Sequence, residues 1–187
     1  MPPRLVILDR DGVLNAESPD HIKSPAEWHP LPGSLEAVAR LTRAGWQVAL
    51  ATNQSGIGRG LFTEDDFAAI QRHIDERLAT LGGRLDPVLY SPHGPDSDSP
   101  MRKPGPGMLE EIARRLGVEL AGVPFVGDSW RDIAAARAAG AQPVLVRTGY
   151  GESTLAQGKD LDGVPVYADL AAFVDAWLAI HPEGPHP

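Results

Sequence analysis

The chain has 187 residues, of which 42% are hydrophobic and 22% are charged, with a formal net charge of -8. This length supports one domain with its own core, and the absence of Cys excludes disulfides and thiolate metal sites. No apolar run is long enough to span a membrane, and the acidic balance disfavours nucleic acid as a partner. Residues 2–4 lead directly into the first apolar run, so we expect no secretion signal and a cytoplasmic protein.

Short apolar runs of strand length alternate with segments of helical period along the chain. The predicted strands are Leu5–Leu8, Val48–Ala51, Val88–Tyr90, Phe125–Val126 and Val144–Val146. Helices are predicted around Leu35–Leu41, after an N-cap at Thr63 with Asp66 three residues on, and over Gly107–Leu116, Arg131–Ala139 and Leu170–Ile180. The alternation predicts a doubly wound, three-layer α/β/α domain with a parallel sheet over residues 1–180 and a flexible tail over 181–187.

Polar residues follow four of the predicted strands. They are Asp9, Thr52–Asn53, Ser91–His93 and Gly127–Asp128. Ligands of such sheets bind beyond the carboxyl ends of the strands, so we expect these residues to share one rim.

Asp9 and Asp11 lie one residue apart at the end of a buried strand, where two carboxylates repel each other unless a cation or a shared proton intervenes. With Asp128 on the same rim, they form a cluster suited to Mg²⁺, which takes one or two carboxylates, water and a substrate phosphate. The alternative is that the carboxylates only cap turns. Asp128 or Ser129 could serve as the N-cap of the following helix without any ligand. Asp132 lies one turn into that helix.

Two further segments offer groups that bind phosphate. The Thr52 hydroxyl and the Asn53 amide lie in a turn after a strand and can cradle phosphoryl oxygens. Arg102 and Lys103 lie between prolines in a stiff loop before a helix. Two such cations are otherwise solvated surface charges, but an acidic cluster with a bound dianion needs them as counter-ions.

The ordered set Asp9-x-Asp11-Gly12, Thr52-Asn53, Lys103 and Gly127-Asp128 resembles the motifs of the haloacid dehalogenase superfamily of phosphohydrolases. The resemblance implies a Mg²⁺-dependent phosphatase in which Asp9 attacks phosphorus and forms an aspartyl phosphate. It implies that Asp11 moves protons, that Thr52 and Asn53 hold phosphoryl oxygens, and that Lys103 shields Asp9. Asp9, the Asp11 carbonyl and Asp128 would be the metal ligands. A neighbouring carboxylate is expected to keep a proton on Asp11 near neutral pH.

The motif spacings leave no room for a cap domain, so we expect an open site covered only by loops 16–32 and 92–101. Within the capless group, "DRDGVLN", "ATNQSGIGRGLF" and "RKPGPGM" look most like D-glycero-D-manno-heptose 1,7-bisphosphate 7-phosphatases of lipopolysaccharide precursor synthesis. That likeness implies a phosphorylated-sugar substrate, with Arg102 as a contact to its distal phosphate or sugar. Trp28 and His29 in the first loop are candidates to cover it.

The loop before Arg102 normally binds structural zinc in this group through Cys and His ligands. Here the corresponding positions are Ser91, His93, Ser99 and Met101. One His cannot build a tetrahedral site, so we predict that the loop carries no structural zinc and is held by its prolines.

Three alternatives remain open on the sequence. The related histidinol-phosphate phosphatases share much of the pattern, and "TNQSGIGRG" also resembles DNA 3′-phosphatases. A non-enzymatic alternative is a phosphoacceptor receiver domain, although its paired acids do not match Asp9-Arg10-Asp11. We expect a monomer that acts on a small molecule, with neither nucleic acid nor a membrane as partner.

Overall fold

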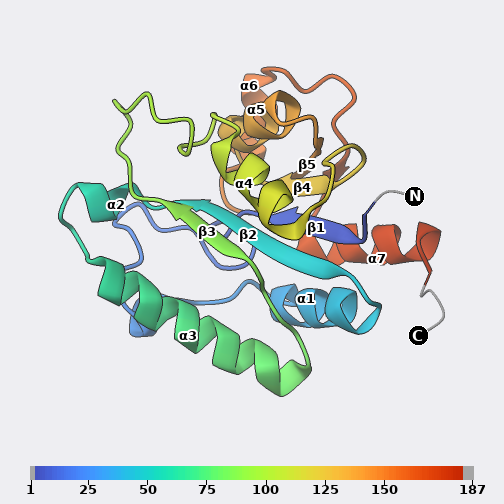
Figure 1. The fold of residues 1–187 in the computed structure, drawn as a ribbon, viewed down its shortest axis with the longest axis horizontal. Helices are drawn as coiled ribbons and strands as arrows, with labels where there is room; N and C mark the ends of the chain where they lie inside the picture. Colours follow the sequence, from blue (N-terminus) through green and yellow to red (C-terminus); the bar gives the residue numbers. More distant parts are fainter. Residues whose placement is uncertain (1–2, 183–187) are drawn as a thin grey trace.

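The computed structural model describes residues 3–182, and its centre is a six-stranded sheet in which every pair of neighbours is parallel (Figure 1). The strand order is β3-β2-β1-β4-β5-β6. The strands are β1 (Leu5–Leu8), β2 (Gln47–Asn53), β3 (Val88–Ser91), β4 (Pro124–Gly127), β5 (Gln142–Val146) and β6 (Val166–Tyr167).

Helices cover both faces of the sheet (Figure 1). One face carries α1 (Ser34–Arg43), α3 (Glu64–Leu81) and α7 (Leu170–Ile180), and the other carries α4 (Gly107–Leu116), α5 (Trp130–Ala138) and α6 (Gly151–Gln157). A short helix α2 (Ser55–Gly58) follows β2, and a 3₁₀ turn, η1 (Pro25–Glu27), lies in the first loop. The predicted three-layer α/β/α fold is confirmed.

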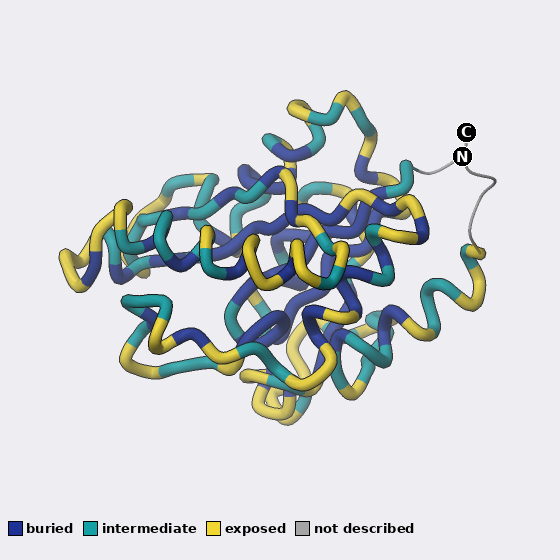
Figure 2. The backbone as a smooth tube through the Cα atoms, turned by 90° about the horizontal axis from the view of Figure 1, so that it is seen from below, coloured by how far each residue is buried: buried dark blue, intermediate teal, exposed yellow. Residues whose placement is uncertain are grey.

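The strands are buried on both faces, as Figure 2 shows by the dark centre of the molecule. In β1, Val6 and Leu8 pack in the core beneath α1, α3 and α7, whereas Leu5 and Ile7 pack against α4 and α5. This alternation explains why the sequence shows an unbroken apolar run instead of an amphipathic strand.

The long elements begin and end close to the predicted residues. Thr63 is the N-cap of α3 and forms a capping box with Asp66, as the sequence predicts. Thr52, Asn53, Ser91 and Gly127 were predicted to follow their strands, but they are the last residues of β2, β3 and β4. The short elements η1, α2, α6 and β6 were not predicted, because none of them carries a periodic apolar pattern.

The expected tail begins at His181. The His181 ring packs on Trp177, and the Pro182 carbonyl accepts a hydrogen bond of 2.9 Å from Arg4 Nη2. Residues 183–187 lie outside the described part of the chain. In residues 3–182, no helix combines the length and the hydropathy needed to cross a membrane.

The strand order places a topological switch point between β1 and β4, because the chain leaves these neighbours toward opposite edges of the sheet. A crevice at the carboxyl ends of such a strand pair is the usual ligand site of doubly wound sheets. Asp9 follows β1 and Asp128 follows β4, so the predicted acidic cluster lies at this crevice.

Candidate active site

Lys103 lies at the centre of the acidic cluster. Its ammonium group donates to the Ala51 carbonyl at 2.8 Å and to Asp132 Oδ1 at 2.8 Å, and it pairs with Asp9 Oδ1 at 2.9 Å. Its side chain is only 2% exposed. Burial alone would lower the pKa of Lys103, but the carboxylates of Asp132 and Asp9 outweigh this effect and raise it above its usual value. Lys103 is therefore a fixed cation between β1, β2 and α5.

Asp132 belongs to the site, although the sequence argument placed it only one turn into a helix. Oδ1 binds Lys103, and Oδ2 accepts hydrogen bonds from the backbone N–H groups of Asp128 and Ser129 and from the Ser129 hydroxyl. Burial would raise the pKa of Asp132, but Lys103 and the Ser129 donors hold it below its usual value. The Ser129–Asp132 capping box could have been found in the sequence, but its contact with Lys103 could not.

Asp9, Asp128 and Asp132 each offer a carboxylate oxygen within 4.8 Å of the others. Both oxygens of Asp132 already have donors, which leaves Asp9 and Asp128 to face a metal ion. Burial, followed by the repulsion of neighbouring carboxylates, raises the pKa of Asp9 and of Asp128 above their usual values. Buried oxygen donors with surplus negative charge fit a hard divalent cation such as Mg²⁺.

Glycines enclose the Asp128 carboxylate. A Cβ atom at Gly12 would lie 2.0 Å from Asp128 Oδ2, and one at Gly149 would lie 2.1 Å from it. The Tyr150 N–H donates to the same oxygen at 2.9 Å. Gly12 also has a φ of +84°, which disfavours any side chain. The Gly in the Asp-x-Asp-Gly motif is thus required both by its backbone conformation and by the space that Asp128 occupies.

The Asp11 carboxylate is not one of the three that converge, and it accepts hydrogen bonds from other side chains. Oδ1 accepts from Arg10 Nε at 2.9 Å and from Asn15 Nδ2 at 3.0 Å, and Oδ2 accepts from Gln54 Nε2 at 2.9 Å. Burial would raise its pKa, but the charge of Arg10 and these hydrogen bonds lower the pKa of Asp11. The expectation that a neighbouring carboxylate keeps Asp11 protonated is wrong for this structure, because the fully buried Arg10 side chain lies against it.

Thr52 and Asn53 lie beside Lys103, at the end of β2. Thr52 is fully buried, and its Oγ1 accepts a hydrogen bond from Gln54 Nε2 at 2.9 Å. The Asn53 side chain donates to the Lys103 carbonyl at 2.9 Å and accepts from the Lys103 N–H at 3.0 Å. The Asn53 side chain therefore fixes the backbone that carries Lys103. Asn53 lines the pocket, whereas the buried Thr52 is not among its lining residues.

A pocket of about 200 Å³ opens above these groups. It is smaller than the ~300–1,000 Å³ of typical sites for drug-sized ligands, so a larger substrate must extend along the surrounding loops. Arg102 and Arg131 both line it, and burial followed by the charge of Arg131 lowers the pKa of Arg102. The sequence argument missed Arg131, Glu17 and Tyr150 at the rim.

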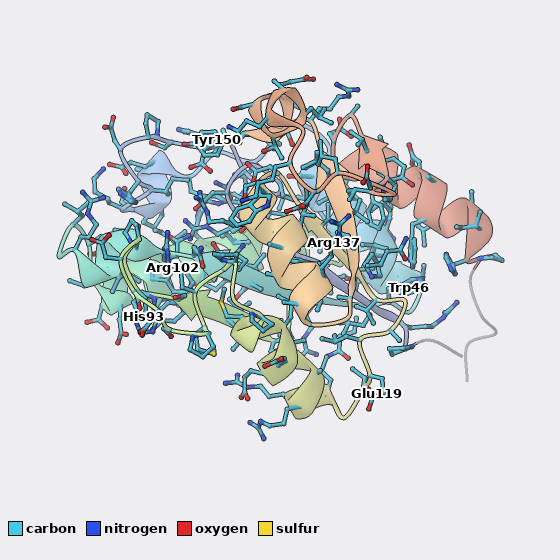
Figure 3. All side chains as sticks on the ribbon, turned by 90° about the horizontal axis from the view of Figure 1, so that it is seen from above. Trp46, His93, Arg102, Glu119, Arg137 and Tyr150 are labelled. Atoms are coloured by element: carbon cyan, nitrogen blue, oxygen red, sulfur yellow. The ribbon has the colours of Figure 1, made fainter. Side chains whose placement is uncertain are left out.

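Figure 3 places Arg102 and His93 at the same end of the molecule as Tyr150, with Trp46 far from them. Arg102 Nη1 donates to the His93 carbonyl at 2.9 Å and so bridges its own loop. Trp28 does not cover the site. It is 2% exposed, with His73 at the edge of its ring and Arg77 over its face, so it is a core residue.

The parallel sheet, with buried carboxylates at its switch point and no domain inserted between residues 9 and 128, has the architecture of a capless haloacid dehalogenase-like hydrolase. A model of the HAD-hydrolase-like family matches residues 100–173. D-glycero-beta-D-manno-heptose-1,7-bisphosphate 7-phosphatase from Bordetella bronchiseptica is 54% identical to this chain. The alignment covers 94% of this chain and 98% of the Bordetella protein. The enzyme of that name from Pseudomonas aeruginosa is 51% identical over 93% of this chain and 97% of its own.

The solved structure of the D,D-heptose 1,7-bisphosphate phosphatase from B. bronchiseptica, complexed with magnesium and phosphate, superposes with a TM-score of 0.92. It is 53% identical and covers 96% of this chain and 99% of its own. The chain therefore belongs to the heptose 1,7-bisphosphate 7-phosphatase family of the haloacid dehalogenase superfamily. The receiver-domain alternative is excluded, since receivers have the strand order 2-1-3-4-5 and this sheet does not.

Proposed function

We propose that this protein removes the 7-phosphate of D-glycero-D-manno-heptose 1,7-bisphosphate, with Mg²⁺ as cofactor. The observation that carries the proposal is the Asp9–Lys103–Asp132 cluster beside Asp128 at the switch point. It occurs in a chain that is 53% identical to a heptose bisphosphate phosphatase solved with magnesium and phosphate. Histidinol phosphate remains the runner-up substrate.

Asp9 is the proposed nucleophile. Its Oδ1 is fixed by the Arg10 N–H at 2.8 Å and by Lys103 at 2.9 Å. A fixed carboxylate oxygen can attack phosphorus in line, and Lys103 offsets the repulsion between that oxygen and the incoming dianion. The P–O bond to the sugar then breaks, and an aspartyl phosphate remains on Asp9.

Asp11 is the proposed proton carrier for both steps. The leaving sugar oxygen takes a proton from Asp11, which later takes a proton from the water that hydrolyses the aspartyl phosphate. In the structure the Asp11 carboxylate accepts hydrogen bonds from Arg10, Asn15 and Gln54, and these favour its ionised form. An incoming phosphate dianion shifts the carboxyl toward its protonated form, because a like charge disfavours ionisation.

Asp9, Asp128 and the Asp11 backbone carbonyl are the proposed metal ligands. Bound Mg²⁺ would supply positive charge that stabilises the negatively charged phosphoryl group during transfer. The Thr52 hydroxyl and the Asn53 backbone N–H would hold phosphoryl oxygens, and Arg102 would contact the distal phosphate or the sugar.

We further propose a single domain over residues 1–180, a cytoplasmic monomer, and a loop without structural zinc. Support for the last point comes from the Arg102–His93 bridge and from backbone hydrogen bonds such as Arg102 N–Ser99 O (3.1 Å) and Gly107 N–Pro100 O (2.8 Å).

The test is the initial rate of phosphate release, with Mg²⁺, from heptose 1,7-bisphosphate, histidinol phosphate and a DNA 3′-phosphate. We expect kcat/KM to be highest for the heptose. A preference for histidinol phosphate would overturn the proposed substrate, and a preference for the DNA end would replace it with a repair function.

A further inference from the structure

Gln54 neither forms nor breaks a bond in the chemistry described above, yet its side chain joins two groups that take part in it. Its Nε2 atom lies 2.9 Å from Asp11 Oδ2 and 2.9 Å from Thr52 Oγ1. The residue is 3% exposed and follows β2 directly. One primary amide therefore reaches both the proposed proton carrier and the proposed phosphate-binding hydroxyl.

The direction of both hydrogen bonds is fixed by chemistry. The Asp11 carboxylate only accepts, so the amide must turn its N–H₂ group toward it, since the flipped amide would set two oxygens against each other. The second N–H then points at Thr52 Oγ1, which accepts. A hydroxyl has one proton to donate, and because Gln54 occupies an acceptor position, the proton of Thr52 stays available for a phosphoryl oxygen.

The same amide selects which oxygen of Asp11 moves protons. Oδ1 accepts two short hydrogen bonds, from Arg10 Nε at 2.9 Å and Asn15 Nδ2 at 3.0 Å. Oδ2 accepts one short bond, from Gln54, and a longer one of 3.3 Å from Arg10 Nη2. Oδ2 therefore accepts the weaker set of hydrogen bonds, which leaves it freer to carry a proton. It is also the oxygen to which Gln54 donates.

We propose that Gln54 is a positioning residue that holds Asp11 Oδ2 and the Thr52 hydroxyl in the arrangement needed for proton transfer to the leaving group. This inference rests on the proposed function. In the step concerned, Asp9 forms a bond to phosphorus, the P–O bond to the alcohol breaks, and the alcohol oxygen takes the proton of Asp11 Oδ2.

Gln54→Met tests the role, because it keeps the length of the side chain and removes both donors. Its kcat/KM is measured with heptose 1,7-bisphosphate, whose alkoxide leaving group needs a proton, and with p-nitrophenyl phosphate, whose leaving group does not. General acid catalysis contributes roughly 10²–10⁴-fold, so we expect the sugar phosphate to lose at least about tenfold more than the aryl phosphate.

Two variants calibrate this ratio. Thr52→Val removes a phosphate contact without touching Asp11, and we expect it to lower kcat/KM equally for both esters. Gln71→Met is the matched control, since Gln71 Nε2 also donates to a carboxylate, Asp75 Oδ1 at 2.8 Å, on helix α3. It should leave both rates unchanged.

Equal losses on the two esters, or no loss, would overturn the role of Gln54 while leaving the proposed function intact. If Gln54→Met does not fold, Gln54→Leu decides the matter by the same ratio, because it also removes both donors. A parent protein that releases phosphate from neither ester would overturn the proposed function, and the role of Gln54 with it.

Discussion

The floor of the pocket and the loop over residues 92–101 are built in different ways. The floor consists of Asp9, Asp11, Gln54, Lys103, Asp128 and Asp132, whose side chains are hydrogen-bonded or paired with one another or with buried backbone. The loop is held mainly by its own backbone, through hydrogen bonds such as Ser97 N–Gly94 O at 3.1 Å and Arg102 N–Ser99 O at 3.1 Å. Residues 95–98 are exposed.

This contrast separates chemistry from recognition. Each polar group of the floor depends on another, so a change at one position leaves a buried charge or donor without its partner. The loop can change its side chains while its backbone hydrogen bonds persist, so we expect it to tolerate substitutions that the floor does not. Five predictions test the contrast.

The largest effect is expected for Asp9→Asn. A carboxamide cannot attack phosphorus, so steady-state phosphate release should fall by roughly 10⁴-fold or more, the scale seen when a covalent nucleophile is removed from a hydrolase. Asp20→Asn, at an exposed position, is the control and should keep the parental rate. Turnover of Asp9→Asn near the parental rate would rule out Asp9 as the nucleophile.

Lys103→Met should be the most destabilising change. It leaves the buried carboxylates of Asp9 and Asp132 without a cation, and removal of one partner from such a cluster costs about 3–5 kcal/mol. Arg84→Met breaks an exposed pair, in which the side chains of Arg84 and Asp86 are 74% and 53% exposed, and should cost at most about 1 kcal/mol. Urea unfolding of both variants measures the difference, and equal costs would refute the account of the floor.

Gly12→Ala should cost more than Gly117→Ala. Both glycines have positive φ, but a Cβ at Gly12 meets Asp128 Oδ2 at 2.0 Å, and one at Gly117 meets nothing within 4 Å. Both variants therefore pay the cost of a side chain at positive φ. The clash with Asp128 should add about 1–3 kcal/mol to the loss of unfolding free energy at Gly12. Unfolding free energies of the two variants give this difference directly, and a difference of zero would mean that Asp128 moves aside freely.

Asp128→Asn should stabilise the protein without Mg²⁺. Burial and the nearby Asp9 make the charge of Asp128 unfavourable there, and a gain of the order of 1 kcal/mol raises Tm by about 2–4 °C in a chain of this size. The variant should also lose the rise in Tm that Mg²⁺ gives to the parent. Asp98→Asn in the exposed loop should change neither value, and a lowered Tm for Asp128→Asn would contradict the electrostatic argument.

No effect is expected when zinc is withheld. Elemental analysis should find far less than one zinc per chain, and treatment with EDTA followed by excess Mg²⁺ should restore the full rate. Stoichiometric zinc, or activity that returns only on adding zinc, would show that the loop is metal-bound after all.

Much of the fold could be predicted because its main strands and helices carry clear apolar patterns. The prediction for α4, Gly107–Leu116, matches its observed bounds. In contrast, α6 buries only Gly151 and Thr154, and β6 has two residues. Such elements are set by the tertiary packing around them, so local periodicity does not reveal them.

The site shows a similar limit. Asp9, Asp11, Lys103 and Asp128 could be predicted to converge, because strand ends and stiff loops place them on one rim. The partners of these residues could not, since contacts such as Gln54–Asp11 and Lys103–Asp132 join segments far apart in sequence. Arg10 illustrates the difficulty. Its position between Asp9 and Asp11 gives no sign in the sequence that its side chain is fully buried.

The three contacts of Lys103 decide how an inactive form of this protein should be made. Any neutral residue at this position removes the contacts of Lys103 with Asp9, β2 and α5 at the same time. Such a variant would lose stability as well as activity, and the two losses could not be separated. Asn at position 9 keeps an oxygen that accepts from Arg10 N–H and Lys103. Asp9→Asn is therefore the form in which an uncleaved substrate can be captured for crystallography, with the surrounding loops in their working arrangement.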